Sequence, residues 1–184
     1  MLSRCGLRIR TGDHVLLDGP SGGGKSTLVS LLIGIRAPQT GVLLAGGLDR
    51  ATVGAEGWRR CIVAAPQFHQ NHIITGPLAF NLLMGRRGPL TPADEQEALD
   101  ICTEMGLGDL LARMPGGMNQ MVGETGWQLS QGERSRVFMA RALLQQADVI
   151  VLDESFAALD PENMTRTLAC VLRRAPALLV VAHQ

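Results

Sequence analysis

The sequence contains a single lysine, and its surroundings assign that lysine a chemical role. Of the 17 basic residues in this 184-residue chain, Lys25 is the only one that is not arginine. A coding bias toward arginine would produce such a composition, but it would not explain the one exception. A compact ammonium on a flexible stem reaches between phosphate oxygens, where a planar guanidinium would not fit. Lys25 lies in segment 19–27, Gly-Pro-Ser-Gly-Gly-Gly-Lys-Ser-Thr, which matches the pattern of a phosphate-binding loop.

The loop pattern predicts what its residues do. Glycines let backbone N–H groups turn inward around a phosphate, and the helix that follows directs its positive end to the same place. Lys25 is predicted to bridge the β- and γ-phosphates and to neutralise charge during hydrolysis, and the Ser26 hydroxyl to bind Mg2+. The predicted ligands of the nucleotide are Gly19, Pro20, Ser21, Gly22, Gly23, Gly24, Lys25, Ser26 and Thr27.

Two consecutive acids after an apolar run form the second chemical element. Residues 149–152 are Val-Ile-Val-Leu, and Asp153 and Glu154 follow directly. In open α/β sheets, ligands bind at the carboxyl ends of the strands, so we expect both carboxylates there. Asp153 is predicted to hold Mg2+, and Glu154 to polarise an attacking water as general base. Many strands end in acids, but together with the loop this pattern favours a nucleoside triphosphatase.

Short apolar strands and helices must position these residues. A buried helix is expected over residues 27–35, directly after the loop. Apolar strands that alternate with helices indicate a parallel sheet covered on both faces, the α/β class of fold. The strands are predicted over residues 7–10, 14–17, 61–65, 148–153 and 178–182.

The middle of the chain has a different character, with helices joined by glycine-rich connections. Thr91 is predicted to cap one helix, because proline and an acid follow it in the first turn. Another helix is expected to begin near Ser130. We therefore expect one domain over 1–184. Its predicted parts are a core at 1–67 and 148–184 and an inserted helical subdomain at about 68–147.

The start of this second helix resembles a known family. Segment 129–133, Leu-Ser-Gln-Gly-Glu, resembles the L-S-G-G-Q signature of ATP-binding cassette (ABC) ATPases. Three other pieces occur in the family's order: Gln67 resembles the Q-loop, Ala-Leu-Asp ending at Asp160 the D-loop, and His183 the switch histidine. The resemblance covers essentially the whole chain. It implies a P-loop NTPase fold with a RecA-like parallel-sheet core.

The resemblance also implies roles for these residues. In this family two domains clamp two ATP molecules head to tail, and each signature faces the γ-phosphate held by the other domain. Ser130 and Gly132 would then contact a partner domain's nucleotide, which a second helix N-terminus would meet from the opposite side. Gln67 would contact both the nucleotide and Mg2+. Asp160 would join the nucleotide-binding set, and His183 would contact the γ-phosphate during hydrolysis.

Three shorter stretches resemble ABC exporters in particular. Segment 122–126 is similar to the exporter x-loop, 75–81 to "G-T-I-x-x-N-I", and 114–117 to "L-P-x-G". In exporters this lobe receives the intracellular coupling helices of a transmembrane domain. The resemblance therefore implies a transmembrane partner, fused or separate, and a location at the cytoplasmic face of a membrane. Ordinary surface loops are the alternative interpretation of these stretches.

The chain also departs from the family pattern. Gln131 and Glu133 replace a glycine and a glutamine of the signature. Ser130-x-x-Glu133 is also a capping box, so the carboxylate either faces the partner's γ-phosphate and weakens the clamp or closes its own helix. Residues 1–18 contain no aromatic residue to stack on adenine, and the chain stops one residue after His183. We expect the inner part of a longer ABC protein, or a partial gene product.

The composition of the chain argues against some classes of function. A net charge of zero argues against direct nucleic-acid binding. Four widely spaced cysteines favour reduced thiols, and the apolar runs are shorter than the ~20 residues that span a bilayer. A soluble ABC ATPase acting on DNA or ribosomes is the alternative to a transporter motor. Its DNA-organising members carry a long coiled coil, for which the stretch between Lys25 and Ser130 is too short. An ATP-binding fragment without hydrolysis is the third possibility.

Two further predictions concern residues outside these motifs. Trp58 is interpreted as a packing residue rather than a platform for a base. Three arginines of the helix after Ser130 are predicted to form a solvated face with intramolecular partners. They are Arg134, Arg136 and Arg141.

Overall fold

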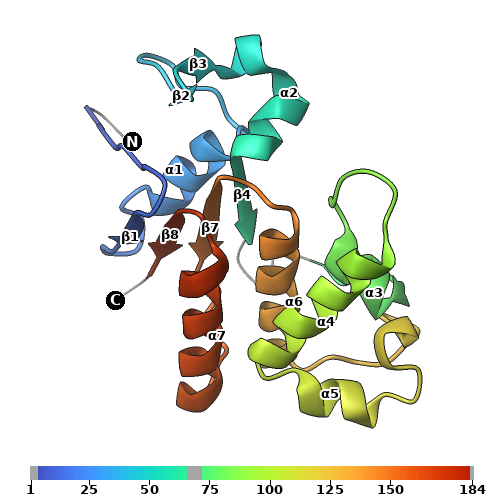
Figure 1. The fold of residues 1–184 in the computed structure, drawn as a ribbon. Coiled ribbons are helices and arrows are strands. Elements are labelled where there is room, and N and C mark those ends of the chain that lie inside the picture. The colour runs from blue at the N-terminus through green and yellow to red at the C-terminus, as the bar shows by residue number, and fades with distance from the viewer. Residues whose placement is uncertain (1–3, 66–71, 183–184) are drawn as a thin grey trace. The chain divides into compact units, whose positions relative to one another are not determined.

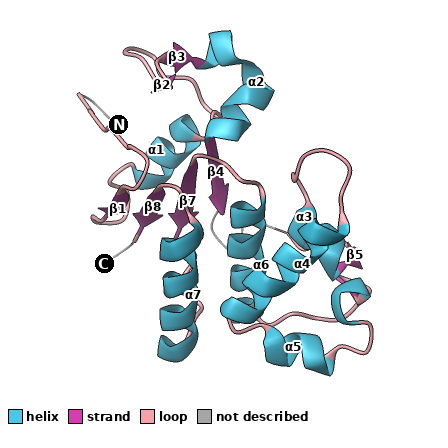
Figure 2. Ribbon diagram, in the orientation of Figure 1, coloured by secondary structure: helices cyan, strands magenta, loops and turns pink. Residues whose placement is uncertain are grey.

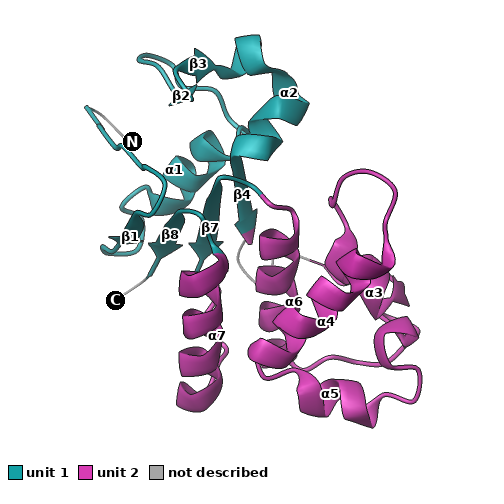
Figure 3. Ribbon diagram, viewed as in Figure 1, with its two compact units in different colours: residues 1–64, 147–154, 175–184 teal, residues 65–146, 155–174 magenta. Residues whose placement is uncertain are grey.

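The chain divides into two compact units. The computed structural model describes residues 4–65 and 72–182. Figure 1 labels the helices and strands, and Figure 2 colours them by type. Figure 3 shows unit 1 in teal, made of Met1–Ala64, Ala147–Glu154 and Ala175–Gln184, and unit 2 in magenta, made of Ala65–Gln146 and Ser155–Arg174.

Unit 1 is built on a four-stranded sheet. The strands are β1 (His14–Leu17), β4 (Ile62–Ala65), β7 (Val149–Asp153) and β8 (Leu178–Val181), in the spatial order β1-β8-β7-β4. β8 lies between β1 and β7 and runs parallel to both. β7 is apolar along almost its whole length because it is an inner strand with both faces covered. The parallel sheet and four of the five predicted strands are confirmed.

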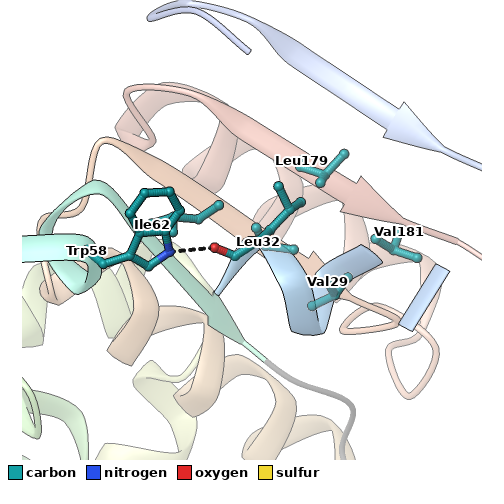
Figure 4. Packing of buried hydrophobic residues seen from close by; sticks show 7 residues of the cluster. Val29, Leu32, Trp58, Ile62, Leu179 and Val181 are labelled. Carbon is teal, nitrogen blue, oxygen red and sulfur yellow. Dashed lines mark hydrogen bonds between the residues drawn. The ribbon is translucent and has the colours of Figure 1, made fainter. Parts of the chain in front are cut away.

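The core of unit 1 joins this sheet to helices α1 (Lys25–Leu32) and α2 (Arg50–Cys61). Trp58 on α2 is buried, and its indole N–H donates to the Leu32 carbonyl on α1 at 2.8 Å (Figure 4). The packing role predicted for this tryptophan is confirmed. The core cluster consists of Val29, Leu32, Trp58, Ile62, Val151, Leu179 and Val181.

A short hairpin that was not predicted from the sequence precedes α2. β2 (Leu44–Ala45) pairs antiparallel with β3 (Leu48–Asp49). The two glycines at 46 and 47 have φ of 57° and 82°, the left-handed pair that a type I′ turn requires. Asp49 then caps α2, because its carboxylate accepts from the Thr52 N–H at 2.8 Å. Each strand has only two residues, which is too short to produce a recognisable alternation.

The predicted strand over residues 7–10 does not form. Within the described ranges, β8 is the only strand hydrogen-bonded to β1, and 7–10 is irregular. The Arg10 N–H donates instead to the Asp13 carboxylate at 2.8 Å. An alternating pattern makes a strand only where a second strand is available to pair with it, and this condition is not met here.

Unit 2 is mainly helical. α4 begins as predicted, with Thr91 and Asp94 forming a reciprocal capping box. None of the helices in the described ranges is both long and apolar enough to cross a membrane. The helices are α3 (Leu78–Leu83), α4 (Pro92–Glu104), α5 (Gly108–Arg113), the 3-10 turn η2 (Gly117–Asn119), α6 (Gln131–Leu144) and α7 (Pro161–Arg174), and the strands are β5 (Gly76–Pro77) and β6 (Met121–Val122).

α6 is the central helix of unit 2, and this overturns the solvated face predicted for its arginines. α3, α4 and α7 all pack against it, so nearly every residue after its first turn is buried. Arg136 and Arg141 are each 8% exposed, and Arg134 is half-buried. The predicted intramolecular partners are present. Arg141 donates to the Asn81 carbonyl at 2.6 Å and lies 5.3 Å from the centre of the Phe138 ring.

The contacts of α7 place it in unit 2, although its residues were predicted to belong to the core with 148–184. α7 packs on α4 and α6. Glu104 at the end of α4 accepts hydrogen bonds from Arg173 and Arg174 on α7, the latter at 2.6 Å and 2.9 Å. Hydrogen bonding to Arg174 lowers the pKa of the Glu104 carboxyl to about 2. These side chains meet across some 70 residues of sequence, so the sequence pattern did not indicate the grouping.

Candidate functional site

The predicted phosphate-binding loop connects β1 to α1. β1 ends at Leu17 and α1 begins at Lys25. Gly24 is the N-cap of α1 with φ of 87°, a conformation that side chains rarely adopt, and it offers no side chain to cap the helix. The first N–H groups of a helix have no acceptor within the helix. Glycine at this position therefore leaves them directed toward the loop, as an anion site requires.

Lys25 is held inside the curve of this loop. It is buried at 6% exposure, and its ammonium donates to the Gly19 carbonyl and to the Pro20 carbonyl at 3.0 Å. Gly23 approaches closely as well, since a Cβ there would lie 3.1 Å from the Pro20 oxygen. The ammonium and the helix N-terminus thus concentrate positive charge at one turn of the backbone, which suits a phosphate group.

The register of the sheet brings the two acids to the same edge as the loop. Leu17 on β1 and Asp153 on β7 both pair with Val181 on β8. Adjacent strands lie about 4.8 Å apart, so the ends of β1 and β7 are about 10 Å from each other. The next residues continue the ladder: the Ala182 N–H donates to the Leu17 carbonyl at 3.0 Å, and the Glu154 N–H to the Val181 carbonyl at 3.1 Å.

The backbone at Glu154 is in an unusual conformation. Its φ of 51° lies in the left-handed region, whereas the preceding Asp153 is the last residue of a regular strand. Such a conformation costs about 1–3 kcal/mol in a residue other than glycine, and it concentrates at functional sites. Asp153 is 4% exposed, while Glu154 is half-buried. The strand therefore delivers one enclosed and one accessible carboxylate.

The donor set at this edge fits Mg2+. The Ser26 hydroxyl lies in the first turn of α1, and the Asp153 carboxylate ends β7. Hard oxygen ligands suit Mg2+, which usually takes one or two protein groups and completes its shell with water and phosphate oxygens. No group of three His, Cys, Asp or Glu side chains arranged for a metal occurs within 4–65 and 72–182. Gln67, predicted to bind Mg2+, and His183 lie outside the described residues.

The signature residues lie at the N-terminus of α6 in unit 2. Ser130 is the N-cap, and its hydroxyl accepts from the Glu133 N–H at 3.2 Å. The Glu133 carboxylate accepts from the Ser130 N–H at 2.7 Å and from Arg113 on α5 at 2.6 Å. Both carboxylate oxygens are thus engaged within unit 2. Of the two roles left open for Glu133, this geometry favours closing its own helix.

Asp160 caps helix α7. Its carboxylate accepts from the Asn163 N–H at 3.0 Å and from the Asn163 side-chain amide at 2.6 Å. These hydrogen bonds hold the pKa of Asp160 below its ordinary value. The segment before it lies against the signature, because a Cβ on Gly132 would be 3.1 Å from the Ala158 carbonyl oxygen. Unit 2 therefore brings Ser130, Gly132 and Asp160 onto neighbouring helix N-termini.

Two of the exporter-like stretches are paired. β5 and β6 are antiparallel, with Gly76 opposite Val122. Gly123 then passes so close that a Cβ would lie 2.8 Å from the Thr75 Cα. Asn81, the last residue of stretch 75–81, is fully buried. Its side-chain amide accepts a hydrogen bond from the Ile74 N–H at 3.0 Å and donates one to the Ile74 carbonyl at 2.8 Å. Stretches 75–81 and 122–126 thus form one continuous piece of unit 2.

Arg136, which was predicted to lie on a solvated helix face, is part of the structure around the signature. It is buried, and its guanidinium donates to carbonyls of α6 and of the α4 C-terminus and to the side chain of Asn163. A signal existed in the sequence: Arg136 lies four residues after Gly132 and four before Ala140, on one line of the helix. Burial lowers the pKa of its guanidinium, and the several acceptors around it keep the buried charge hydrogen-bonded.

Comparison with known proteins agrees with this geometry. A family model described as "ABC transporter" matches residues 2–157. The mycobactin import ATP-binding/permease protein IrtB of Mycolicibacterium smegmatis is 35% identical over 190 residues, covering 94% of this chain and 32% of that protein. The β-(1→2)glucan export ATP-binding/permease protein NdvA of Mesorhizobium japonicum is 34% identical over 185 residues, covering 100% of this chain and 30% of that protein.

A solved structure gives the same result for the fold. The structure of a bacterial Atm1-family ABC exporter with ATP bound superimposes with a TM-score of 0.80 at 30% identity, covering 93% of this chain and 30% of that chain. The chain thus spans about a third of the length of these relatives. It has the P-loop NTPase fold with an additional helical subdomain, as the resemblance implied. From the motifs, the fold and these matches together, the chain belongs to the ABC transporter family as one of its nucleotide-binding domains.

Proposed function

We propose that this chain binds ATP with Mg2+ and hydrolyses the β–γ phosphate bond to power an ABC transporter of the exporter type. The observation that carries the proposal is the sheet register. Leu17, Val181 and Asp153 are aligned, so the loop after β1 and the acids after β7 meet at one edge. Ligands bind at this edge in open parallel sheets.

Each residue at this edge has a distinct task in the proposal. The backbone of segment 19–27 surrounds the phosphates, and Lys25 exchanges its bonds to loop carbonyls for phosphate oxygens. Ser26 and Asp153 hold Mg2+, which, when bound, neutralises charge on the β- and γ-phosphates. Glu154 orients a water and accepts its proton as the water attacks the γ-phosphorus.

The proposal includes a second nucleotide-binding domain, arranged head to tail. Ser130 and Gly132 would then face the γ-phosphate held by the partner, and Asp160 would join the same contact surface. The exposed N-terminus of α6 supports this, since the Ser130 hydroxyl accepts from Glu133 and keeps its own hydrogen to donate. Gln67 and His183 keep their proposed contacts with Mg2+ and the γ-phosphate.

Unit 2 also offers a surface for a transmembrane partner. Ile74, Phe80 and Met121 are 48%, 51% and 46% exposed, and they lie on or beside the paired strands β5 and β6. Large exposed apolar side chains that gather in this way are typical of interaction sites. We propose that an intracellular helix of a transmembrane domain, fused or separate, docks here. The chain would then lie at the cytoplasmic face of a membrane, attached through that partner.

The mass of the Glu154→Gln variant in solution tests this proposal. Without the general base, the nucleotide should stay trapped between two domains, so ATP with Mg2+ should shift the mass from monomer to dimer. Lys25→Ala in the same background is the control and should stay monomeric, because it weakens phosphate binding. A Glu154→Gln chain that binds no ATP, or that binds ATP and hydrolyses it at the wild-type rate, would contradict the proposed roles.

A further inference from the structure

Arg136 connects three separate parts of unit 2. Its side chain donates to the Gly132 carbonyl in the first turn of α6 at 3.2 Å. It also donates to the Met105 and Gly106 carbonyls at the end of α4, at 3.2 Å and 2.7 Å. A fourth hydrogen bond, at 2.7 Å, goes to the Asn163 side-chain oxygen in the first turn of α7. A cation at the carboxyl end of α4 is also favoured by the helix dipole.

Asn163 extends this connection to the N-cap of α7. Its amide oxygen accepts from Arg136, and its amide nitrogen donates to the Asp160 carboxylate at 2.6 Å. An amide can serve an arginine and a carboxylate at once because it carries both an acceptor and donors. The chain of bonds therefore runs from Gly132 through Arg136 and Asn163 to Asp160, without a gap.

The backbone makes room for this chain of bonds at two glycines. A Cβ on Gly106 would lie 2.9 Å from the Asn163 side-chain oxygen and 3.3 Å from the Arg136 guanidinium. A Cβ on Gly132 would lie 3.1 Å from the Ala158 carbonyl. The first turn of α6 and the segment before Asp160 are thus in direct contact as well as joined by polar bonds.

We infer that Arg136 and Asn163 are positioning residues that hold the signature turn, 130–134, and the Asp160 segment, 158–160, in one fixed arrangement. This inference rests on the proposed head-to-tail dimer. In that dimer, both segments would reach the partner's nucleotide together. Breaking the bond between Arg136 and Asn163 then frees both segments, although neither of these residues touches the nucleotide. These two residues therefore act on dimer formation, and the phosphate-binding loop of unit 1 is unaffected.

Hydrogen–deuterium exchange of the nucleotide-free chain tests the arrangement itself. Asn163→Ala removes the bonds to Arg136 and Asp160 and should speed amide exchange in 130–134 by about fivefold or more, as local opening becomes easier. Arg166→Gln is the matched control, since Arg166 lies on α7 and pairs with the exposed Glu162. Unchanged exchange in 130–134 in the Asn163→Ala chain would overturn the inference.

Asn163→Asp separates the two halves of the connection. The aspartate keeps an acceptor for Arg136 but places a second carboxylate beside Asp160, where an amide donor was. Segment 130–134 should stay protected from exchange while 158–160 opens. Faster exchange in both segments to the same extent would contradict a role for Arg136 in the link.

A second experiment measures how strongly the chain dimerises in the Glu154→Gln background. Asn163→Ala and Arg136→Lys should weaken the ATP- and Mg2+-dependent dimer about tenfold, and leave ATP affinity of the monomer within about twofold, because coupling acts on dimerisation alone. In the hydrolysing chain the same variants should lower kcat more than they raise KM. Failure of Glu154→Gln itself to dimerise would contradict the proposed function, and the exchange data would still decide the inference. Dimerisation at wild-type strength in both variants would overturn it.

Discussion

Glu133→Gln distinguishes the two roles that the sequence left open for this carboxylate. Glu133 is 9% exposed, and its two oxygens accept from Ser130 and Arg113. The glutamine amide keeps one oxygen, so the bond from Ser130 can persist while the charge is lost. The Arg113 side chain is 59% exposed, which screens the ion pair. We therefore expect Glu133→Gln to lower the free energy of unfolding by about 0.2–1 kcal/mol.

A substitution at Glu133 that also removes the helix cap should lower the free energy of unfolding further. Glu133→Ala leaves the Ser130 N–H without the carboxylate, so the loss should rise to about 1–2 kcal/mol. Urea unfolding followed by circular dichroism measures both values. Arg113→Gln completes a double-mutant cycle, and its coupling to Glu133→Gln should equal the ion-pair contribution.

The strength of the ATP-dependent dimer distinguishes the two roles of Glu133 in a second measurement. In the Glu154→Gln background, adding Glu133→Gln should leave the ATP-dependent dimer unchanged or slightly weaker, because the capping carboxylate faces its own helix. A dimer that tightens tenfold would mean that a negative charge had been removed from the neighbourhood of the partner's γ-phosphate, and the capping role would be wrong.

Three further predictions concern stability. Hydrogen bonding to Arg174 lowers the folded pKa of Glu104 to about 2, so its contribution is present above its ordinary value of 4.5 and disappears as pH falls toward 2. Over that range the wild-type chain should lose about 1–2 kcal/mol more than Glu104→Gln, measured by urea unfolding at a series of pH values. Trp58→Phe removes the 2.8 Å hydrogen bond from the indole N–H to a carbonyl of α1. It should lower the free energy of unfolding by about 1 kcal/mol in the same assay at neutral pH. Gly126→Ala, whose Cβ would lie 2.5 Å from a carbonyl oxygen of β6, should cost about 1–3 kcal/mol. Gly108→Ala, whose Cβ would have open space, is the control for Gly126→Ala and should leave the free energy of unfolding nearly unchanged.

Local signals predicted the four strands of the parallel sheet and the helices α1, α4 and α6. The strands β1, β4, β7 and β8 are short apolar runs, each bounded by turn or polar residues, and all four form within one residue of the predicted limits. The N-cap of α4 at Thr91 and the capping box of α6 also formed as their local sequence indicated, because a helix cap involves only a few consecutive residues. Segment 7–10, in which apolar residues alternate with arginines, did not form a strand, since pairing depends on a distant partner.

Sequence alone determined the chemistry of the chain: a phosphate-binding loop with its single lysine, two acids after an apolar strand, and a signature turn before a helix. These are local patterns, in which backbone geometry and side-chain type act over a few residues. Tertiary structure alone decided the environment of each charge. Arg136 and Arg141 were predicted to be solvated and are buried, because α3, α4 and α7 surround α6. The Glu133 carboxylate also pairs with Arg113, which lies 20 residues away in the sequence. Burial and ion pairing depend on segments tens of residues away, and for Arg136 the local sequence offered only the small residues on its line of the helix as a signal.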